Sequence, residues 1–149
     1  MKKVNKKEIT ITQIYHADIR HTQKLPLYLS KIYAGFPSPA DDYLDRRLDL
    51  NEFLIKHPAA TFFVRVDGDS MMHAGIYSGD ILIVDRSLEP KNNKIIVAVV
   101  NGDFTVKRFR RTKGRIYLFS ENPDFPPIEV TEDIDFEIWG VVIHVIHSF

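Results

Sequence analysis

The chain contains no cysteine, which excludes disulfide bonds, thiol nucleophiles and cysteine metal sites. It also contains no run of 18 or more apolar residues, so we expect no membrane-spanning segment. The start "MKKVNKKEITITQIYHADIR" is basic but lacks the apolar stretch of a secretion signal. Together these absences favour a protein of the reducing cytoplasm.

What is present suits one folded domain with a charged extension. Of the 149 residues, 44% are apolar and 27% are charged, which is enough to form a core. Residues 1–34 carry seven Lys/Arg and two acids, a net of +5, whereas residues 35–149 carry 13 and 18, a net of −5. A basic arm of this kind can lie on the acidic body or bind a polyanion, and a solvated tail is the simpler alternative.

The second half of the chain has the pattern of a β protein. Short apolar runs alternate with turn signals such as Asn-Gly and Asn-Pro. The runs predict strands over "TFFVRV", "DILIVD", "KIIVAVV", "FTVKRFR", "RIYLFS" and "DFEIWGVVIHVI". Strands at this spacing indicate a mainly β fold, with a curved, barrel-like and mostly antiparallel sheet.

The first sixty residues predict an extended arm followed by short helices. The alternation in "KKEITITQIY" predicts a strand that adds to a sheet edge. Prolines at 26, 37 and 39 exclude a central helix or strand around them, and Ala34–Pro39 should be extended, exposed chain. Helical spacing in "ADDYLDRRLDL", after Ser38 and Pro39 as N-cap and first helical residue, predicts one short helix.

A second short helix is predicted over "DLNEFLIKHP". Asp49 and Glu52 have the spacing of a capping box, in which each side chain satisfies a free N–H at the helix start. Pro58 should end this helix.

Ser70 lies at the centre of "GDSMMHAGIYSGD", between two predicted strands. Gly68 permits a tight turn, and a turn leaves backbone N–H groups without ladder partners. Such groups could stabilise an oxyanion beside the Ser70 hydroxyl. The alternative is an ordinary turn serine that caps its own backbone.

A nucleophilic serine needs a base, and the histidines offer none with clear geometry. His144 and His147 are three apart in a predicted strand, so they face opposite sides and cannot share a catalytic or metal site. His73 is too near Ser70 in sequence for a geometric argument. No other residue pattern indicates a metal or a cofactor.

Lys107 is the other candidate base. In "GDFTVKRF" it shares a strand face with Thr105 and Phe109. Base catalysis by lysine requires the neutral amine, and burial disfavours the charged ammonium. The alternative is a lysine on an edge strand that faces water.

Three segments carry a resemblance to a known family. "GDSMMHAGIYSGDILIVD", "VAVVNGDFTVKR" and "AGFPSPADDYLDRRLDLNEFLIKHPAATFFVRV" resemble the LexA/UmuD family of self-cleaving serine–lysine peptidases, and the last segment resembles its UmuD branch. The resemblance spans about residues 33–147. It implies Ser70 as nucleophile, Lys107 as general base and Ala34-Gly35, in "YAGFPSP", as the cleaved bond. It divides the chain into a basic arm, 1–34, and a peptidase-like β domain, 35–149, with the fold of the LexA C-terminal domain.

The resemblance also implies partners and a role. UmuD-like proteins cleave themselves when they meet a RecA–single-stranded DNA filament in the bacterial cytoplasm. The shortened form then acts as a homodimer with a UmuC-like Y-family polymerase during translesion synthesis in the SOS response. Direct sequence-specific DNA binding of any strength is not expected.

Three alternatives remain at this stage. A LexA-like or phage repressor would need a helix-turn-helix domain, for which residues 1–34 are too few and too rich in strand pattern. A signal-peptidase-like enzyme would need a membrane segment. The third alternative is a polymerase accessory that only binds and whose catalytic pair is vestigial. It differs from the self-cleaving peptidase only in lacking activity.

Overall fold

The computed structural model describes residues 7–17, 24–28 and 44–149. They form two compact units, one made of residues up to Ala17 together with Ala59–Phe149 and the other made of Asp18–Pro58. Among the described residues, no helix has the length and apolar character needed to cross a membrane.

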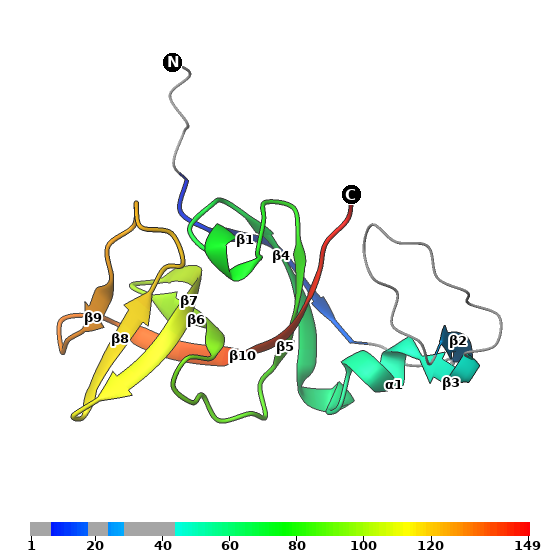
Figure 1. Cartoon of the computed structure of the whole chain (residues 1–149). Coiled ribbons are helices and arrows are strands. Elements are labelled where there is room, and N and C mark those ends of the chain that lie inside the picture. Colours follow the sequence, from blue (N-terminus) through cyan, green and yellow to red (C-terminus); the bar gives the residue numbers. More distant parts are fainter. Residues whose placement is uncertain (1–6, 18–23, 29–43) are drawn as a thin grey trace, which may run out of the picture. The chain divides into compact units, whose positions relative to one another are not determined.

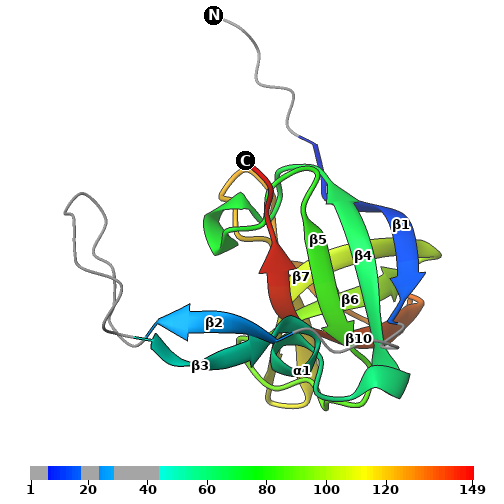
Figure 2. The ribbon, with the colours of Figure 1, turned by 90° about the vertical axis from the view of Figure 1, so that its right-hand side faces the viewer.

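The larger unit is built on one eight-stranded antiparallel sheet. Its strands, in spatial order, are β1 (Thr10–His16), β4 (Thr61–Asp67), β5 (Ile81–Asp85), β10 (Phe136–Ile146), β6 (Ile95–Val100), β7 (Asp103–Thr112), β8 (Arg115–Phe119) and β9 (Ile128–Val130). The sheet curls, as Figure 2 shows, so that β1 at one edge also contacts β7. The predicted mainly β, curved and antiparallel fold is therefore confirmed.

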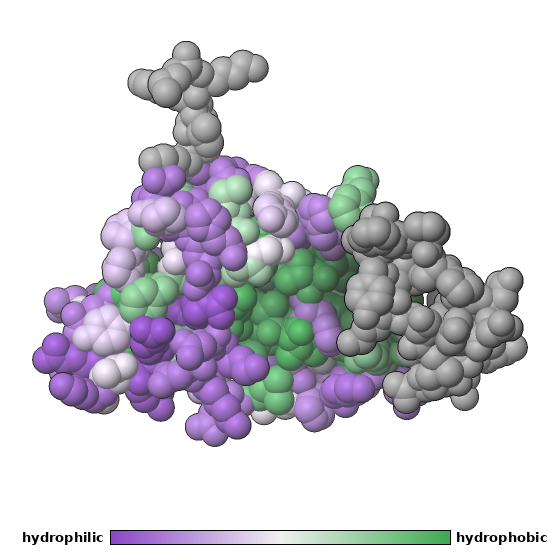
Figure 3. Space-filling model, in the orientation of Figure 1, coloured by the Kyte–Doolittle hydropathy of each residue, from purple (hydrophilic) through white to green (hydrophobic). Residues whose placement is uncertain are grey.

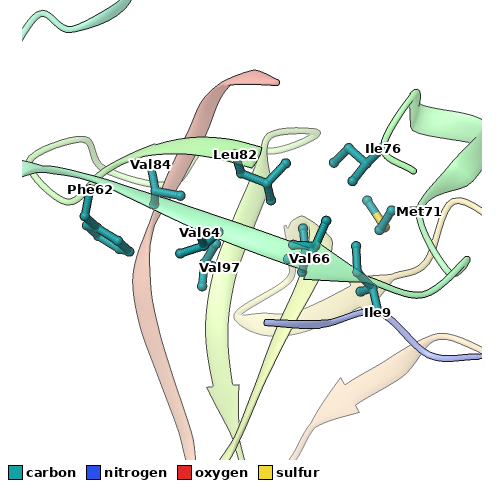
Figure 4. Packing of buried hydrophobic residues seen from close by; sticks show 10 residues of the cluster. Ile9, Phe62, Val64, Val66, Met71, Ile76, Leu82, Val84 and Val97 are labelled. Carbon is teal, nitrogen blue, oxygen red and sulfur yellow. The ribbon is translucent and has the colours of Figure 1, made fainter. Parts of the chain in front are cut away.

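The curl encloses an apolar core. Along β4, Phe62, Val64 and Val66 are buried at alternate positions, as the strand period of two requires. They pack in one cluster with residues from β5, β6 and β7, from the chain before β1 and from the segment after β4 (Figure 4): Ile9, Met71, Ile76, Leu82, Val84, Val97 and Val106. A second cluster joins β6, β7, β8 and β10: Ile96, Ala98, Phe109, Leu118 and Val141.

All six strands predicted from Thr61 onward are present, and so is the N-terminal one. β1 lies at the sheet edge, as "KKEITITQIY" predicted, and pairs with β4 (Figure 1). The three-residue strand β9 was not predicted, because two prolines precede it and it spans too few residues to show a period.

In the smaller unit, the first predicted helix is wrong and the second is confirmed. Leu44–Asp49 is strand β3, not helix, and it pairs with β2 (Lys24–Tyr28). Leu44 and Leu48 are four apart, which fits one face of a helix and also one face of a strand, and the ladder with β2 decides between the two. Pro26 lies in β2, where each strand of a two-stranded sheet is an edge and a missing N–H is tolerated.

The second predicted helix is α1 (Leu50–Leu54). The Asp49 side chain caps it by accepting a hydrogen bond from the Asn51 N–H at 3.0 Å. The helix ends four residues before Pro58, because Ile55 already adopts an extended backbone. Pro58 instead begins a 3-10 turn, Pro58–Ala60, which leads into β4. Residues 29–43, with the N-cap predicted at Ser38, lie outside the described residues.

The core cluster generates a direct test. Replacing the buried Leu82 by alanine should lower the free energy of unfolding by about 2–5 kcal/mol, because it leaves a cavity among packed strands. Leu88→Ala is the matched control, since that leucine is 37% exposed and should change stability by less than about 0.5 kcal/mol. Urea denaturation of both variants checks the difference, and equal losses would contradict the assigned core.

Candidate active site

Ser70 lies in the turn that follows β4. The side chain is fully buried, and its Oγ accepts a hydrogen bond from the Ile9 N–H at 3.0 Å. The next residue, Met71, inserts into the core, and the 3-10 turn Met72–Ala74 follows it. The segment that presents Ser70 is thus anchored by packing immediately after the hydroxyl.

The rest of this segment is fixed by polar contacts. Asp80, 2% exposed, accepts a hydrogen bond from the Tyr77 N–H at 2.8 Å and contacts His147 Nδ1 at 2.5 Å. Ser78 and Lys7 both contact the Asp67 carboxylate at the end of β4. The Lys7 ammonium, followed by the Ser78 hydroxyl, holds the pKa of Asp67 below its usual value.

Lys107 lies in the middle of β7, between β6 and β8. It is 2% exposed, so the alternative of an edge-strand lysine that faces water is wrong. Its Nζ donates to Glu8 Oε1 at 2.5 Å and to Ser120 Oγ at 2.6 Å. The lysine is therefore a buried cation with one anionic and one neutral partner.

A single extended segment, Lys7–Ile11, connects the two candidate residues. Consecutive residues of this segment contact them, since Glu8 reaches Lys107 and Ile9 reaches Ser70. The preceding residue, Lys7, also contacts the turn, because its carbonyl oxygen accepts a hydrogen bond from the Asp69 N–H at 2.7 Å. The segment then enters β1 and pairs with β4.

Gly68 permits this close passage. A Cβ at this position would stand 2.4 Å from the Glu8 carbonyl oxygen and 2.6 Å from the Ile9 Cα, and the residue has a φ of +118°. Both the space and the backbone conformation therefore demand glycine. The predicted role of Gly68 in a tight turn is confirmed, and the structure adds its role as a surface for a neighbouring peptide.

A groove of about 630 Å³ adjoins Lys107, and Ser70 is not among the residues that line it. Its lining comes from the segment before and within β1, from the β6–β7 hairpin and β7, and from β9: Glu8, Ile9, Thr10, Ile11, Val100, Gly102, Asp103, Phe104, Thr105, Lys107 and Ile128. Within the described part of the chain, the buried Thr105 Oγ1 has no hydrogen-bond partner. The groove thus has apolar walls and includes Lys107 and Thr105 among its lining residues.

The other sequence candidates lie elsewhere. His147 follows the end of β10 and contacts Asp80, while His73 is exposed on its 3-10 turn. Across residues 7–17, 24–28 and 44–149, no group of three or more His, Asp or Glu side chains could hold a metal ion. Ala34 and Gly35 fall outside the described residues.

Sequence reasoning missed two site residues. Glu8 is one of only two acids among residues 1–34, and an isolated carboxylate beside a strand pattern was the available signal. Ser120 follows β8, 13 residues after Lys107 across the β7–β8 hairpin, so its contact depends on the register in which β7 and β8 pair.

The described part of the chain thus combines a curled antiparallel sheet with a buried serine and a buried lysine, which contact neighbouring residues of one extended segment. The chain belongs to the Peptidase S24-like family, whose model matches residues 26–143.

Within this family the chain is UmuD-like. It is 46% identical to Protein ImpA of Salmonella typhimurium over 123 residues, which cover 82% of this chain and 83% of that protein. It is 46% identical to Protein MucA of Escherichia coli over 121 residues, 80% of this chain and 82% of that one. Its identity to the LexA repressor of Colwellia psychrerythraea is 37% over 132 residues, 88% of this chain and 62% of the repressor.

The anchoring of β1 can be tested through Ile9, which is fully buried. Ile9→Ala should weaken the docking of the segment by about 2 kcal/mol or more, so amide exchange across β1 should become roughly thirtyfold faster or more. Ile14→Ala is the control, because Ile14 lies within β1 itself with 39% exposure. Hydrogen exchange with mass spectrometry compares the two variants.

Varying the salt concentration shows whether packing or charge holds the N-terminal segment on the sheet. The pair between Lys7 and Asp67 is exposed, at 58% and 38%, and such pairs are screened and weak. Exchange across β1 should therefore change little between low and high salt. A large loosening by salt would show that charge, and not strand pairing with Ile9, holds the arm.

Proposed function

We propose that this protein is a serine peptidase that cuts its own Ala34-Gly35 bond, with Ser70 as nucleophile and Lys107 as general base. One observation carries the proposal. Two buried side chains with complementary chemistry contact neighbouring residues of one extended peptide that runs along β4. A cleft that accommodates one extended segment of this chain in that way can accommodate another.

The chemistry follows from the roles of the two residues. A neutral Lys107 amine removes the proton from Ser70 as Oγ attacks the Ala34 carbonyl carbon. Backbone N–H groups of the turn around Ser70 stabilise the oxyanion, and collapse of the intermediate transfers the proton to the Gly35 nitrogen as the peptide bond breaks. Water then hydrolyses the ester between Ala34 and Ser70 and regenerates the hydroxyl.

The sequence around the proposed cut suits this cleft. Ala34 and Gly35 are small, and Pro37 and Pro39 limit the conformations that must be ordered on binding. The cut would separate the basic residues 1–34 from an acidic body of 115 residues, 35–149. These are the two domains that we propose.

The UmuD-like relatives support a wider role. We infer that a RecA–single-stranded DNA filament stimulates the cut in the bacterial cytoplasm, and that the shortened form is a subunit of a Y-family polymerase in DNA-damage tolerance. A homodimer fits the apolar area near β5 and β10 in Figure 3. Val145 and Ile146 of β10 are also exposed apolar residues.

The product can be measured directly. The purified protein should yield Met1–Ala34 and Gly35–Phe149 when incubated with a RecA–single-stranded DNA filament, and intact-mass spectrometry identifies the bond. Gly35→Glu should block the cut, because a bulky charged residue does not fit a cleft suited to a small one, while the fold is retained. A cut at another bond would exclude the proposed site, and a folded wild type that never cuts would leave a purely binding polymerase accessory.

Lys107 should determine the pH dependence of this cut. In the absence of a filament, the rate should rise from neutral to alkaline pH, because only the neutral amine can act as a base. Lys107→Arg keeps a cation that stays protonated, so it should be inactive at every pH, and Ser70→Ala should be inactive as well. Circular dichroism checks that both variants are folded. A normal rate in folded Lys107→Arg would show that another group is the base.

A further inference from the structure

We propose that the cleft has a second ligand in the same chain. The segment Lys7–Ile11 acts as a pseudosubstrate that occupies the place of the scissile peptide, and the Glu8 carboxylate blocks the chemistry there. This inference rests on the proposed peptidase function and adds a mode of control to it.

The backbone of the segment lies directly on the proposed nucleophile. The nitrogen of the Glu8–Ile9 peptide bond is 3.0 Å from Ser70 Oγ, to which its N–H donates. Because its N–H donates to Oγ, it engages the oxygen lone pair with which serine would attack a carbonyl carbon. The serine is thus both covered and hydrogen-bonded.

The side chain of Glu8 binds Lys107, the proposed base. Its carboxylate accepts a hydrogen bond from the buried Lys107 Nζ at 2.5 Å. A carboxylate partner favours the charged ammonium, and an ammonium has no lone pair with which to accept the Ser70 proton. Glu8 therefore removes the base at the same time as Ile9 engages the nucleophile.

The segment is held as a fitted ligand. Ile9 is fully buried in the cluster that contains Val66 and Met71, and the Lys7 carbonyl accepts from the Asp69 N–H. The close passage over Gly68 leaves no room for a second backbone at the same place. The segment around Ala34 and the segment around Glu8 must therefore compete for this cleft.

The competition is reversible because Glu8 keeps contact with water. The Glu8 side chain is 45% exposed, whereas Lys107 is 2% exposed. Displacing the segment releases a carboxylate that is already half hydrated, while Lys107 loses its anion in a buried site. Loss of that anion favours the neutral amine, so displacement restores the base.

The experiment compares partner-free cleavage in Glu8→Gln and in the wild type. The amide keeps the size of the side chain and removes its charge, so cleavage at Ala34-Gly35 should be at least tenfold faster. Glu129→Gln is the control, because Glu129 is a carboxylate that pairs with Arg115 outside the groove, and its rate should equal that of the wild type. Unchanged cleavage in Glu8→Gln would overturn the proposal.

A binding measurement makes the test independent of catalysis. In the full chain with Ser70→Ala, a synthetic peptide of residues 30–39 should bind several-fold more tightly when Glu8→Gln is added, as measured by calorimetry. If affinity rises but no variant ever cuts, the peptidase function fails and the competition stands. If the filament stimulates cutting, but Glu8→Gln changes neither the affinity for the peptide nor the rate of partner-free cleavage, the peptidase function stands and the pseudosubstrate proposal fails.

Glu8→Ala gives a further readout of position. It places a small residue before Ile9, as Ala34 precedes Gly35 at the proposed cut. A new product that begins at Ile9 in its mass spectrum would support the substrate-like placement of the segment. Loss of protection across β1 in this variant, without faster cleavage at Ala34-Gly35, would contradict it.

Discussion

The burial of the Lys107 ammonium is the constraint on which the site depends. A cation with 2% exposure in the middle of β7 needs partners, because an unpaired buried charge is unfavourable by several kcal/mol. The sheet supplies one from each side. Ser120 follows the neighbouring strand β8, and Glu8 comes from the segment that the curl of the sheet brings to β7. The curl of the sheet therefore supplies the buried Lys107 side chain with its carboxylate partner.

The segment from Gly68 to Asp80 has a structural role in addition to the chemical role that we propose for it. Met71 and Ile76 belong to the main core cluster, and Asp80 is tied to the Tyr77 N–H and to His147. Packing and buried hydrogen bonds of neighbouring residues therefore hold Ser70 in place, in addition to the bond that its own Oγ accepts from the Ile9 N–H. A side chain held this way needs little reorganisation for the nucleophilic role that we propose for it.

The sequence was sufficient for those parts of the fold that depend on local pattern. The strands from Thr61 onward were predictable because alternation and turn signals agree. The same alternation grouped Lys107 with Thr105 and Phe109, which are buried with it, but it left open whether the lysine faces water. The helix expected over residues 40–50 was wrong in its described part because leucines four apart satisfy both periods. Only pairing with β2, a contact between distant segments, decided for a strand.

The site shows the same division. Ser70 and Gly68 stand in a short motif, and their burial and turn geometry were open to prediction. The contact of Glu8 with Lys107 joins residues 99 positions apart, so it depends on the closure of the whole sheet. Local pattern carries no signal for such a pair, and charge composition indicated only that the arm is basic.

β1 also finishes the sheet, since its ladder satisfies the outward N–H and C=O groups of β4. A body without residues 1–34 has β4 as a bare edge, next to a core that has lost Ile9. Unpaired edges of this kind attract another strand. Removal of the arm would thus turn an interior strand into a template for pairing, and a change in covalent structure would become a change in which chains can assemble.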